Sequence, residues 1–101
     1  MKQTFFFLLA AMFTLSSAAQ DNPAYAKQFF IRGKDTLPLR VMYPLNYDAK
    51  KQYPLLVFLH GAGERGTNNE AQLIHGAKLF ADSANRKQFP AIVVIPQCPY
   101  T

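Results

Sequence analysis

Two uninterrupted apolar runs predict the core strands of this chain. Leu55 to Leu59 and Ile92 to Ile95 contain no polar side chain, which is typical of parallel strands that are covered on both faces. The segment between the two runs is long enough for the right-handed helical crossover that parallel strands require. The order of strand, helix and strand therefore predicts an α/β fold.

An antiparallel hairpin is predicted before these runs. Ala26 to Arg32 and Leu37 to Tyr43 are rich in apolar, aromatic and β-branched residues, and residues 33–36 (GKDT) join them. Pro44 to Pro54 is polar and bounded by prolines, so we expect a surface connection there.

The crossover carries its own signals for a helix. Thr67 followed by Glu70 matches a capping box, which predicts a helix that begins at Asn68. Gly76 interrupts the apolar pattern, and because an interior glycine costs a helix about 1 kcal/mol, we expect a break or a close contact there. The polar residues Asn85 to Gln88 should turn the chain back. The stripe expected to pack in the core comprises Leu73, Ile74, Ala77, Phe80, Ala81 and Ala84.

The N-terminus has the pattern of an export signal. Lys2 precedes the apolar run Phe5 to Leu15, and small residues follow it, so residues 1–19 are predicted to be a signal peptide and residues 20–101 the mature chain. The run is shorter than the about 20 residues of a membrane span. We expect a secreted or periplasmic protein with no stable membrane anchor.

Composition and charge narrow the classes of function. Hydrophobic residues make up 50% of the chain and charged residues 17%, which indicates a globular protein. The formal charge is +5, but the basic residues are scattered, so we expect no nucleic-acid partner. Cys98 is the only cysteine, so it is free, pairs with another chain or pairs with a cysteine outside this sequence. We expect it to be a small buried residue, because a free cysteine usually packs like one.

The segment His60 to Gly66 (HGAGERG) follows the first apolar run directly, and two interpretations compete for it. Gly61, Gly63 and Gly66 satisfy the dinucleotide-binding pattern GxGxxG. In that fold, however, the helix begins within the glycine motif, and an acidic residue ends the next strand. Here the capping signal comes after Gly66, and the next apolar run ends in Pro96 and Gln97.

The second interpretation is an oxyanion loop. Attack on an ester carbonyl places negative charge on its oxygen, and a fixed backbone N–H aimed at that oxygen lowers the barrier by about 3 kcal/mol. The small residues Gly61, Ala62 and Gly63 allow the backbone to approach the oxygen closely. A His-Gly loop of this kind supplies one oxyanion donor in lipases and esterases. HGAGERG fits this role better.

Three segments together carry a resemblance to a known family. LLVFLHGAGERG, NNEAQLIHG and FPAIVVIPQCP resemble the N-terminal part of secreted α/β-hydrolases of the phospholipase/carboxylesterase and dienelactone hydrolase type, including polyhydroxybutyrate depolymerase-like and feruloyl esterase-like enzymes. The resemblance covers roughly Leu37 to Pro99. It implies a partial α/β-hydrolase fold and a serine hydrolase of small-molecule or polymer-linked esters that needs no cofactor. Oligomeric state is not indicated.

The resemblance also assigns site residues. It implies that Ala62 donates the oxyanion N–H, with Gly63 as the neighbouring candidate. His60 is then structural, with its imidazole hydrogen-bonded beneath the loop. Glu64 and Arg65 either fix the loop through an ion pair, touch substrate or are solvated. Gly61 and Gly66 complete the supporting motif. No metal site is expected, because no second histidine or cysteine stands at ligand spacing from His60.

The catalytic triad of such enzymes is not found in this sequence. Its nucleophile lies in GxSxG and is followed by an acid and a histidine, whereas the only serines are Ser16, Ser17 and Ser83. A triad of Ser83, Asp82 and His60 would have the wrong chain order. We therefore expect a truncated chain whose nucleophile, acid and base lie downstream. A non-catalytic secreted binding protein and a peptidase of the prolyl oligopeptidase type stay open as further interpretations.

Overall fold

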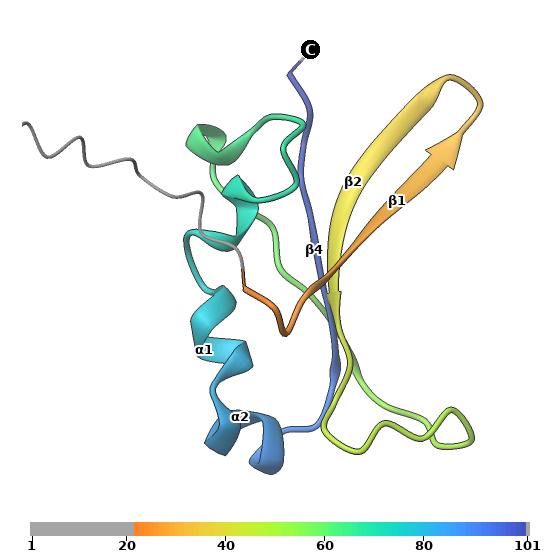
Figure 1. The fold of residues 1–101 in the computed structure, drawn as a ribbon, viewed down its shortest axis with the longest axis vertical. Coiled ribbons are helices and arrows are strands. Elements are labelled where there is room, and N and C mark those ends of the chain that lie inside the picture. The colour runs from red at the N-terminus through yellow and green to blue at the C-terminus, as the bar shows by residue number, and fades with distance from the viewer. Residues whose placement is uncertain (1–21, 101) are drawn as a thin grey trace, which may run out of the picture.

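The structure is a computed structural model that describes residues 22–100, so the predicted signal peptide lies outside the described residues. A mixed sheet with the strand order β1-β2-β4-β3 forms its centre, and Figure 1 labels β1, β2 and β4 of this sheet. The strands are β1 (Ala26–Arg32), β2 (Asp35–Met42), β3 (Leu55–Val57) and β4 (Ile92–Pro96). Between β3 and β4 lie the short 3₁₀ turns η1 (Ala62–Glu64) and η2 (Ala71–Leu73) and the helices α1 (Ala77–Ala81) and α2 (Ser83–Gln88). The predicted α/β fold class is confirmed.

The predicted hairpin is confirmed with a tighter turn. β1 and β2 pair antiparallel from Ala26 opposite Val41 to Arg32 opposite Asp35. Only two residues connect the strands, and Gly33 has a φ of +59°, a conformation that glycine adopts without strain and that tight hairpins favour. The hairpin extends away from the helices (Figure 1).

β4 is an inner strand of the sheet and the second strand of the predicted β, helix, β unit. It pairs parallel with β3 and antiparallel with β2. Val93 and Ile95 are buried, because alternate side chains of a strand point to the same face. The parallel pairing of β3 and β4 confirms the predicted crossover order.

The prediction that Leu55 to Leu59 is covered on both faces is wrong for the described residues. β3 contains only Leu55–Val57 and pairs only with β4. Leu56 packs against the core, whereas Leu55 and Val57, which point to the opposite face, are 64% and 52% exposed. The reason is that β3 is the edge strand of this sheet, and no described element packs over its outer face.

The predicted helix beginning at Asn68 is also wrong. Asn69 has a φ of +54°, which lies outside the helical region. The Asn68 Oδ1 accepts hydrogen bonds from the backbone N–H groups of Glu70 (3.0 Å) and Ala71 (3.1 Å). Asn68 therefore performs the capping role that we assigned to Thr67, and Glu70 forms an ion pair with Lys27 at 3.1 Å instead.

The predicted break at Gly76 is confirmed in both respects. Gly76 has a φ of +79° and precedes α1. A Cβ atom at this position would lie 2.7 Å from Cζ of Phe58, so the chain also makes a close contact there. Phe58 in turn packs edge-on against Phe80 with 5.5 Å between ring centroids.

The end of the crossover differs from the prediction. Asn85 to Gln88 belong to α2 and do not form a turn. The Asp82 carboxylate accepts a hydrogen bond from the Asn85 N–H at 3.2 Å, which caps the helix and explains its formation. The apolar stripe that the sequence predicts for the core is therefore only partly buried. Leu73 and Ala77 are buried, whereas Ile74 and Ala84 are exposed. The buried apolar core consists of Tyr25, Met42, Leu73, Ala77, Val93 and Ile95.

Residues 22–100 include no helix with the length and apolar character that crossing a bilayer requires.

Candidate oxyanion loop

The parallel pairing of β3 and β4 brings the segments after these two strands to the same edge of the sheet. After β3 comes the loop of residues 60–66, and after β4 come Gln97 and Cys98. Three hydrogen bonds join the two segments. Open α/β sheets bind ligands at the carboxyl ends of their parallel strands. This edge is therefore the candidate location of a functional site.

His60 connects the start of the loop to the end of β4. Its Nε2 accepts a hydrogen bond from the Cys98 backbone N–H at 2.9 Å. Because Nε2 is the acceptor, the neutral ring carries its proton on Nδ1. That nitrogen contacts the Gly61 carbonyl oxygen and donates to it. Both ring nitrogens are therefore used within the protein, and His60 has no free nitrogen for a metal or a proton transfer.

The middle of the loop presents unpaired backbone N–H groups. Residues Ala62–Glu64 form η1, closed by a hydrogen bond from the Glu64 N–H to the Gly61 carbonyl at 3.3 Å. The first N–H groups of any such turn have no partner within it. Within residues 22–100, the N–H groups of Ala62 and Gly63 donate to no protein atom, and both residues are exposed. Two adjacent donors are thus available to a ligand.

Glu64 and Arg65 do not pair with each other. The Glu64 Oε1 lies 3.0 Å from Nε2 of His75, which links η1 to the crossover, while Arg65 is exposed. The Oε2 atom of Glu64 lies 3.1 Å from the position that a Cβ would take at Gly61. A side chain at residue 61 would therefore displace this carboxylate.

Gly66 ends the loop in a conformation that favours glycine. Its φ is +147°, and its N–H donates to the Cys98 carbonyl at 3.0 Å. The residue is buried. The loop is consequently attached to the segment after β4 at both of its ends.

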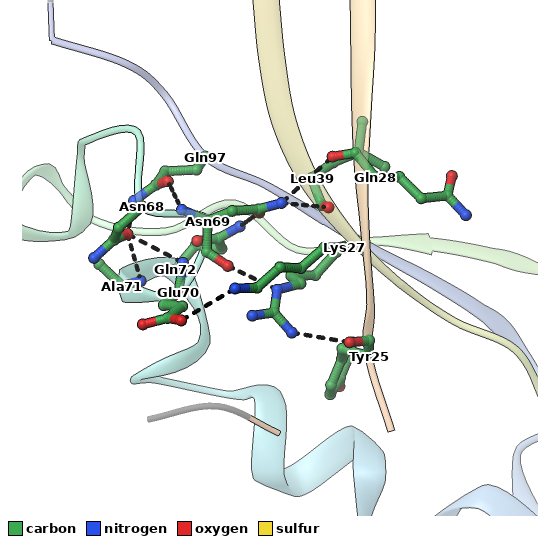
Figure 2. Close-up of polar contacts among 11 residues, drawn as sticks. Tyr25, Lys27, Gln28, Leu39, Asn68, Asn69, Glu70, Ala71, Gln72 and Gln97 are labelled. Carbon is green, nitrogen blue, oxygen red and sulfur yellow. Dashed lines mark hydrogen bonds and ion pairs between the residues drawn. The ribbon is translucent and has the colours of Figure 1, made fainter. Parts of the chain in front are cut away.

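A buried polar network joins Asn69, which follows the loop in the chain, to β2 and to Gln97 (Figure 2). The Asn69 N–H donates to Oε1 of Gln97 at 2.7 Å, and its side-chain amide donates to the Leu39 carbonyl at 3.1 Å. Arg40 is 1% exposed, and its Nε donates to the Asn69 carbonyl at 2.7 Å. These contacts hold Asn69 in its positive-φ conformation, because they satisfy its backbone and side-chain groups away from water.

Sequence reasoning missed Arg40, Asn69 and Gln97 as supporting residues. A signal was present for Arg40, a cation within the apolar run Leu37 to Tyr43, since a charge within a strand that is otherwise buried needs polar partners. Asn69 and Gln97 act through contacts with residues distant in the chain, so no local pattern indicates them.

Tyr25 connects the start of β1 to α1. Its hydroxyl donates to the Ala77 carbonyl at 2.8 Å, and its carbonyl accepts a hydrogen bond from Nη1 of Arg40 at 2.9 Å. Burial raises the pKa of the Tyr25 phenol from 10.0 to about 12, and the positive charge of Arg86 opposes the rise. The phenol is thus a neutral structural donor.

The remaining candidates do not assemble into a catalytic group. Ser83 begins α2 and Asp82 caps it, whereas His60 is bonded to the loop and to Cys98. Cys98 is exposed, so the prediction that it is buried is wrong; it lies two residues beyond the end of β4 at Pro96, where no described element covers its side chain. No cluster of metal-ligating side chains occurs among residues 22–100.

Comparisons with known proteins find relatives by sequence. No protein-family model matches the chain. It is 31% identical over 77 residues to a protein of Aspergillus terreus (strain NIH 2624 / FGSC A1156) with the name "Probable dipeptidyl-peptidase 5", and 32% identical over 77 residues to one of Aspergillus niger with the same name. Each alignment covers 68% of this chain and 11% of the relative.

A solved structure is similar as well. The crystal structure of a thermostable esterase superposes with a TM-score of 0.68 and 36% sequence identity, over 75% of this chain and 21% of the esterase chain. The chain therefore spans about a tenth of the length of the curated relatives and about a fifth of that of the esterase. It carries part of the α/β-hydrolase fold and is related in sequence to hydrolases of the esterase and dipeptidyl-peptidase kinds.

Proposed function

We propose that residues 60–66 are the oxyanion loop of a secreted serine hydrolase that acts on carboxylic esters. The observation that carries this proposal is the pair of exposed N–H groups of Ala62 and Gly63, which donate to no protein atom among residues 22–100. These groups lie in the loop after β3, and the chain is similar to a solved esterase. Ala62 is assigned as the donor and Gly63 as its neighbouring candidate. The substrate is a small-molecule or polymer-linked ester.

The chemistry divides between this chain and residues outside the sequence. A serine beyond Thr101, activated by a histidine, attacks the ester carbonyl carbon and forms an acyl-enzyme as the alcohol leaves. Water then releases the acid. In both steps, negative charge develops on the carbonyl oxygen, and the Ala62 N–H donates a hydrogen bond to it. His60 keeps the start of the loop in place.

Hydrolysis of peptide bonds is a second candidate, because two relatives are named as dipeptidyl-peptidases. The same loop chemistry serves an amide carbonyl. The esterase has the higher identity and the larger coverage, so we rank ester hydrolysis first. Kinetic comparison of p-nitrophenyl butyrate with a dipeptidyl p-nitroanilide decides between them.

A dinucleotide-binding role and a non-catalytic binding role are less well supported. In a dinucleotide-binding protein the helix would begin within the glycine motif, but α1 begins at Ala77, and β4 ends in Pro96 with no acidic residue. A non-catalytic binding protein on the same scaffold would lack a reactive serine. Labelling with a fluorophosphonate would separate it from a hydrolase.

Replacement of Ala62 with proline tests the proposed donor, in the protein expressed from its complete reading frame. Proline lacks the N–H but is tolerated at the first position of a helical turn, and Gly61 has φ −81° and ψ 176°, a conformation compatible with a following proline. We expect kcat for p-nitrophenyl butyrate to fall by about 10² to 10³.

Ser83→Pro is the matched control. Ser83 is the first residue of α2, and Asp82 before it has φ −56° and ψ 130°, so the same replacement is tolerated there. We expect this variant to keep the wild-type kcat. Equal activities of Ala62→Pro and the wild type would refute the assignment of the donor, and loss of activity in Ser83→Pro would reopen a role for Ser83.

Export is proposed from the sequence pattern of residues 1–19. Cleavage before Gln20 or Asp21 would leave the mature chain beginning just ahead of Tyr25, whose burial anchors the start of the sheet. N-terminal sequencing of the protein from its native source would test this assignment.

A further inference from the structure

The segment after β4 holds the candidate loop at three points. The Cys98 N–H donates to His60 at the start of the loop (2.9 Å), and the Cys98 carbonyl accepts from Gly66 at its end (3.0 Å). Between them, Nε2 of Gln97 donates to the Glu64 carbonyl at 3.0 Å. The Gln97 contact is the only one of the three made by a side chain of this segment, and it reaches the turn η1 itself.

Gln97 is fixed by its surroundings. The side chain is 0% exposed. Its Oε1 accepts from the Asn69 N–H at 2.7 Å, and its Nε2 also donates to Oδ1 of Asn68 at 2.9 Å. Rotation of the amide by half a turn would place its oxygen against the oxygen atoms of Glu64 and Asn68. It would also place its NH₂ group against the Asn69 N–H. The orientation is therefore determined, with the donor facing Glu64.

The turn needs such support to act as an oxyanion site. Its own closing hydrogen bond, from Glu64 to Gly61, is 3.3 Å long, which is beyond the usual range of about 2.7–3.2 Å. Stabilisation of an oxyanion depends on donors that are oriented before the reaction. A second contact, at the Glu64 carbonyl, holds the last residue of the turn whose first two residues carry the Ala62 and Gly63 N–H groups.

We propose that Gln97 is a positioning residue for the oxyanion loop: its Nε2 holds the Glu64 carbonyl and thereby orients the Ala62 and Gly63 N–H groups toward the carbonyl oxygen of the substrate. This inference rests on the proposed function. Gln97 does not touch the substrate and acts through the turn.

The test replaces Gln97 with methionine in the protein from its complete reading frame. Methionine has a similar length but makes none of these hydrogen bonds. We expect kcat for p-nitrophenyl butyrate to fall about 10- to 100-fold, because a small misplacement of donors has effects of this size, while KM changes by less than about threefold. A boronic acid that mimics the tetrahedral intermediate should bind more weakly by the same factor as kcat falls.

Gln72→Met is the matched control. Gln72 is also 0% exposed and bonds to Asn69 and to the Ile95 carbonyl, but to no residue of the loop. We expect it to lower the thermal midpoint as Gln97→Met does, yet to keep kcat within about threefold of the wild type. A readout of kcat thus separates positioning from general loss of stability.

Gln97→Glu is a second variant, in case methionine prevents folding. It keeps the acceptor for Asn69 and the size of the side chain but loses the donor to Glu64 when ionised. Protonation restores an O–H donor, so the activity of Gln97→Glu relative to the wild type should rise as pH falls.

Each result separates the role of Gln97 from the function of the site. A wild-type protein that hydrolyses neither esters nor dipeptidyl anilides would refute the proposed function itself. If the wild type is active, two outcomes would overturn the role of Gln97 alone. One is an unchanged kcat in folded Gln97→Met, and the other is an equal loss of kcat in Gln97→Met and Gln72→Met. A relative activity of Gln97→Glu that stays near one at all pH values would overturn it as well.

Discussion

At the level of single residues, backbone conformation decides where the crossover is interrupted. Gly76 is recognisable from the sequence because a glycine within an apolar helical pattern is unfavourable. Asn69 is not recognisable in this way, because asparagine occurs both inside helices and in the positive-φ conformation it has here. Its conformation depends on Arg40, Gln97 and Leu39, which are distant in the sequence. For this reason the predicted helix at Asn68 is wrong, whereas the predicted break at Gly76 is confirmed.

Replacement of Gly76 with alanine is expected to lower the free energy of unfolding by about 2–4 kcal/mol. The positive φ contributes about 1–2 kcal/mol, and the rest comes from the contact of the new Cβ with Phe58 at 2.7 Å. Chemical denaturation of the protein from its complete reading frame measures the change.

Gly33→Ala is the control for this prediction. Gly33 also has a positive φ, but nothing lies within 4 Å of its Cβ position, so only the conformational cost of about 1–2 kcal/mol remains. Equal losses in the two variants would contradict the importance of the Phe58 contact.

At the level of helices and strands, the strands were more predictable than the helices. Apolar runs identify β2, β3 and β4 because the apolar character of a strand is read from its own residues, without knowledge of its partners. The helices α1 and α2 are short, and the Asp82 cap between them interrupts the pattern that would have marked one long helix. The sequence places residues 60–66 after the strand that becomes β3, but their attachment to Gln97 and Cys98 depends on the parallel pairing of β3 with β4.

The contact between β1 and α1 predicts a loss of stability at high pH. The pKa of Tyr25 is about 12 in the folded protein because of burial, against about 10 in an unfolded chain. Below pH 10 the phenol is protonated in both the folded and the unfolded chain, so its contribution to the free energy of unfolding is fully present. As pH rises from 10 to 12, the unfolded chain releases this proton first, so stability falls by up to about 3 kcal/mol.

Tyr25→Phe should remove this part of the pH dependence. The variant loses the hydrogen bond to Ala77, which costs about 1 kcal/mol at neutral pH. Its free energy of unfolding should then fall less steeply than that of the wild type between pH 9 and 11.5. Identical slopes in urea denaturation would show that the Tyr25 phenol does not titrate as described.

Across the whole molecule, residues 22–100 leave much apolar surface uncovered. Leu55, Val57 and Leu59 are 64%, 52% and 72% exposed. An open apolar cavity of about 720 Å³ also lies between β3, α1 and the segment after α2, with Leu79 and Phe89 in its lining. The sequence predicts that β3 is covered on both faces because its side chains are apolar. Apolar character alone does not indicate which elements of the structure lie over a strand.

A polypeptide of residues 22–101 is expected to self-associate. The exposed edge strand β3 presents unpaired backbone groups beside apolar side chains, a combination that favours pairing between chains. Light scattering at micromolar concentration should detect assemblies. Val57→Lys should reduce them, because a charge on an edge strand opposes pairing.

Thr36→Lys is the matched control, since it adds the same charge at an exposed position of β2 that lies away from β3. We expect it to leave association unchanged. A monodisperse monomer of the unmodified polypeptide at all concentrations would contradict the prediction.

The role of residues 60–66 as the source of the oxyanion donor is best tested by a crystal structure of the complete protein after reaction with a fluorophosphonate. We predict a phosphonylated serine from beyond Thr101, with the phosphonyl oxygen at a distance of about 2.7–3.1 Å from the backbone nitrogen of Ala62 or Gly63. A phosphonyl oxygen that is bound by other donors, with residues 60–66 away from it, would contradict this role.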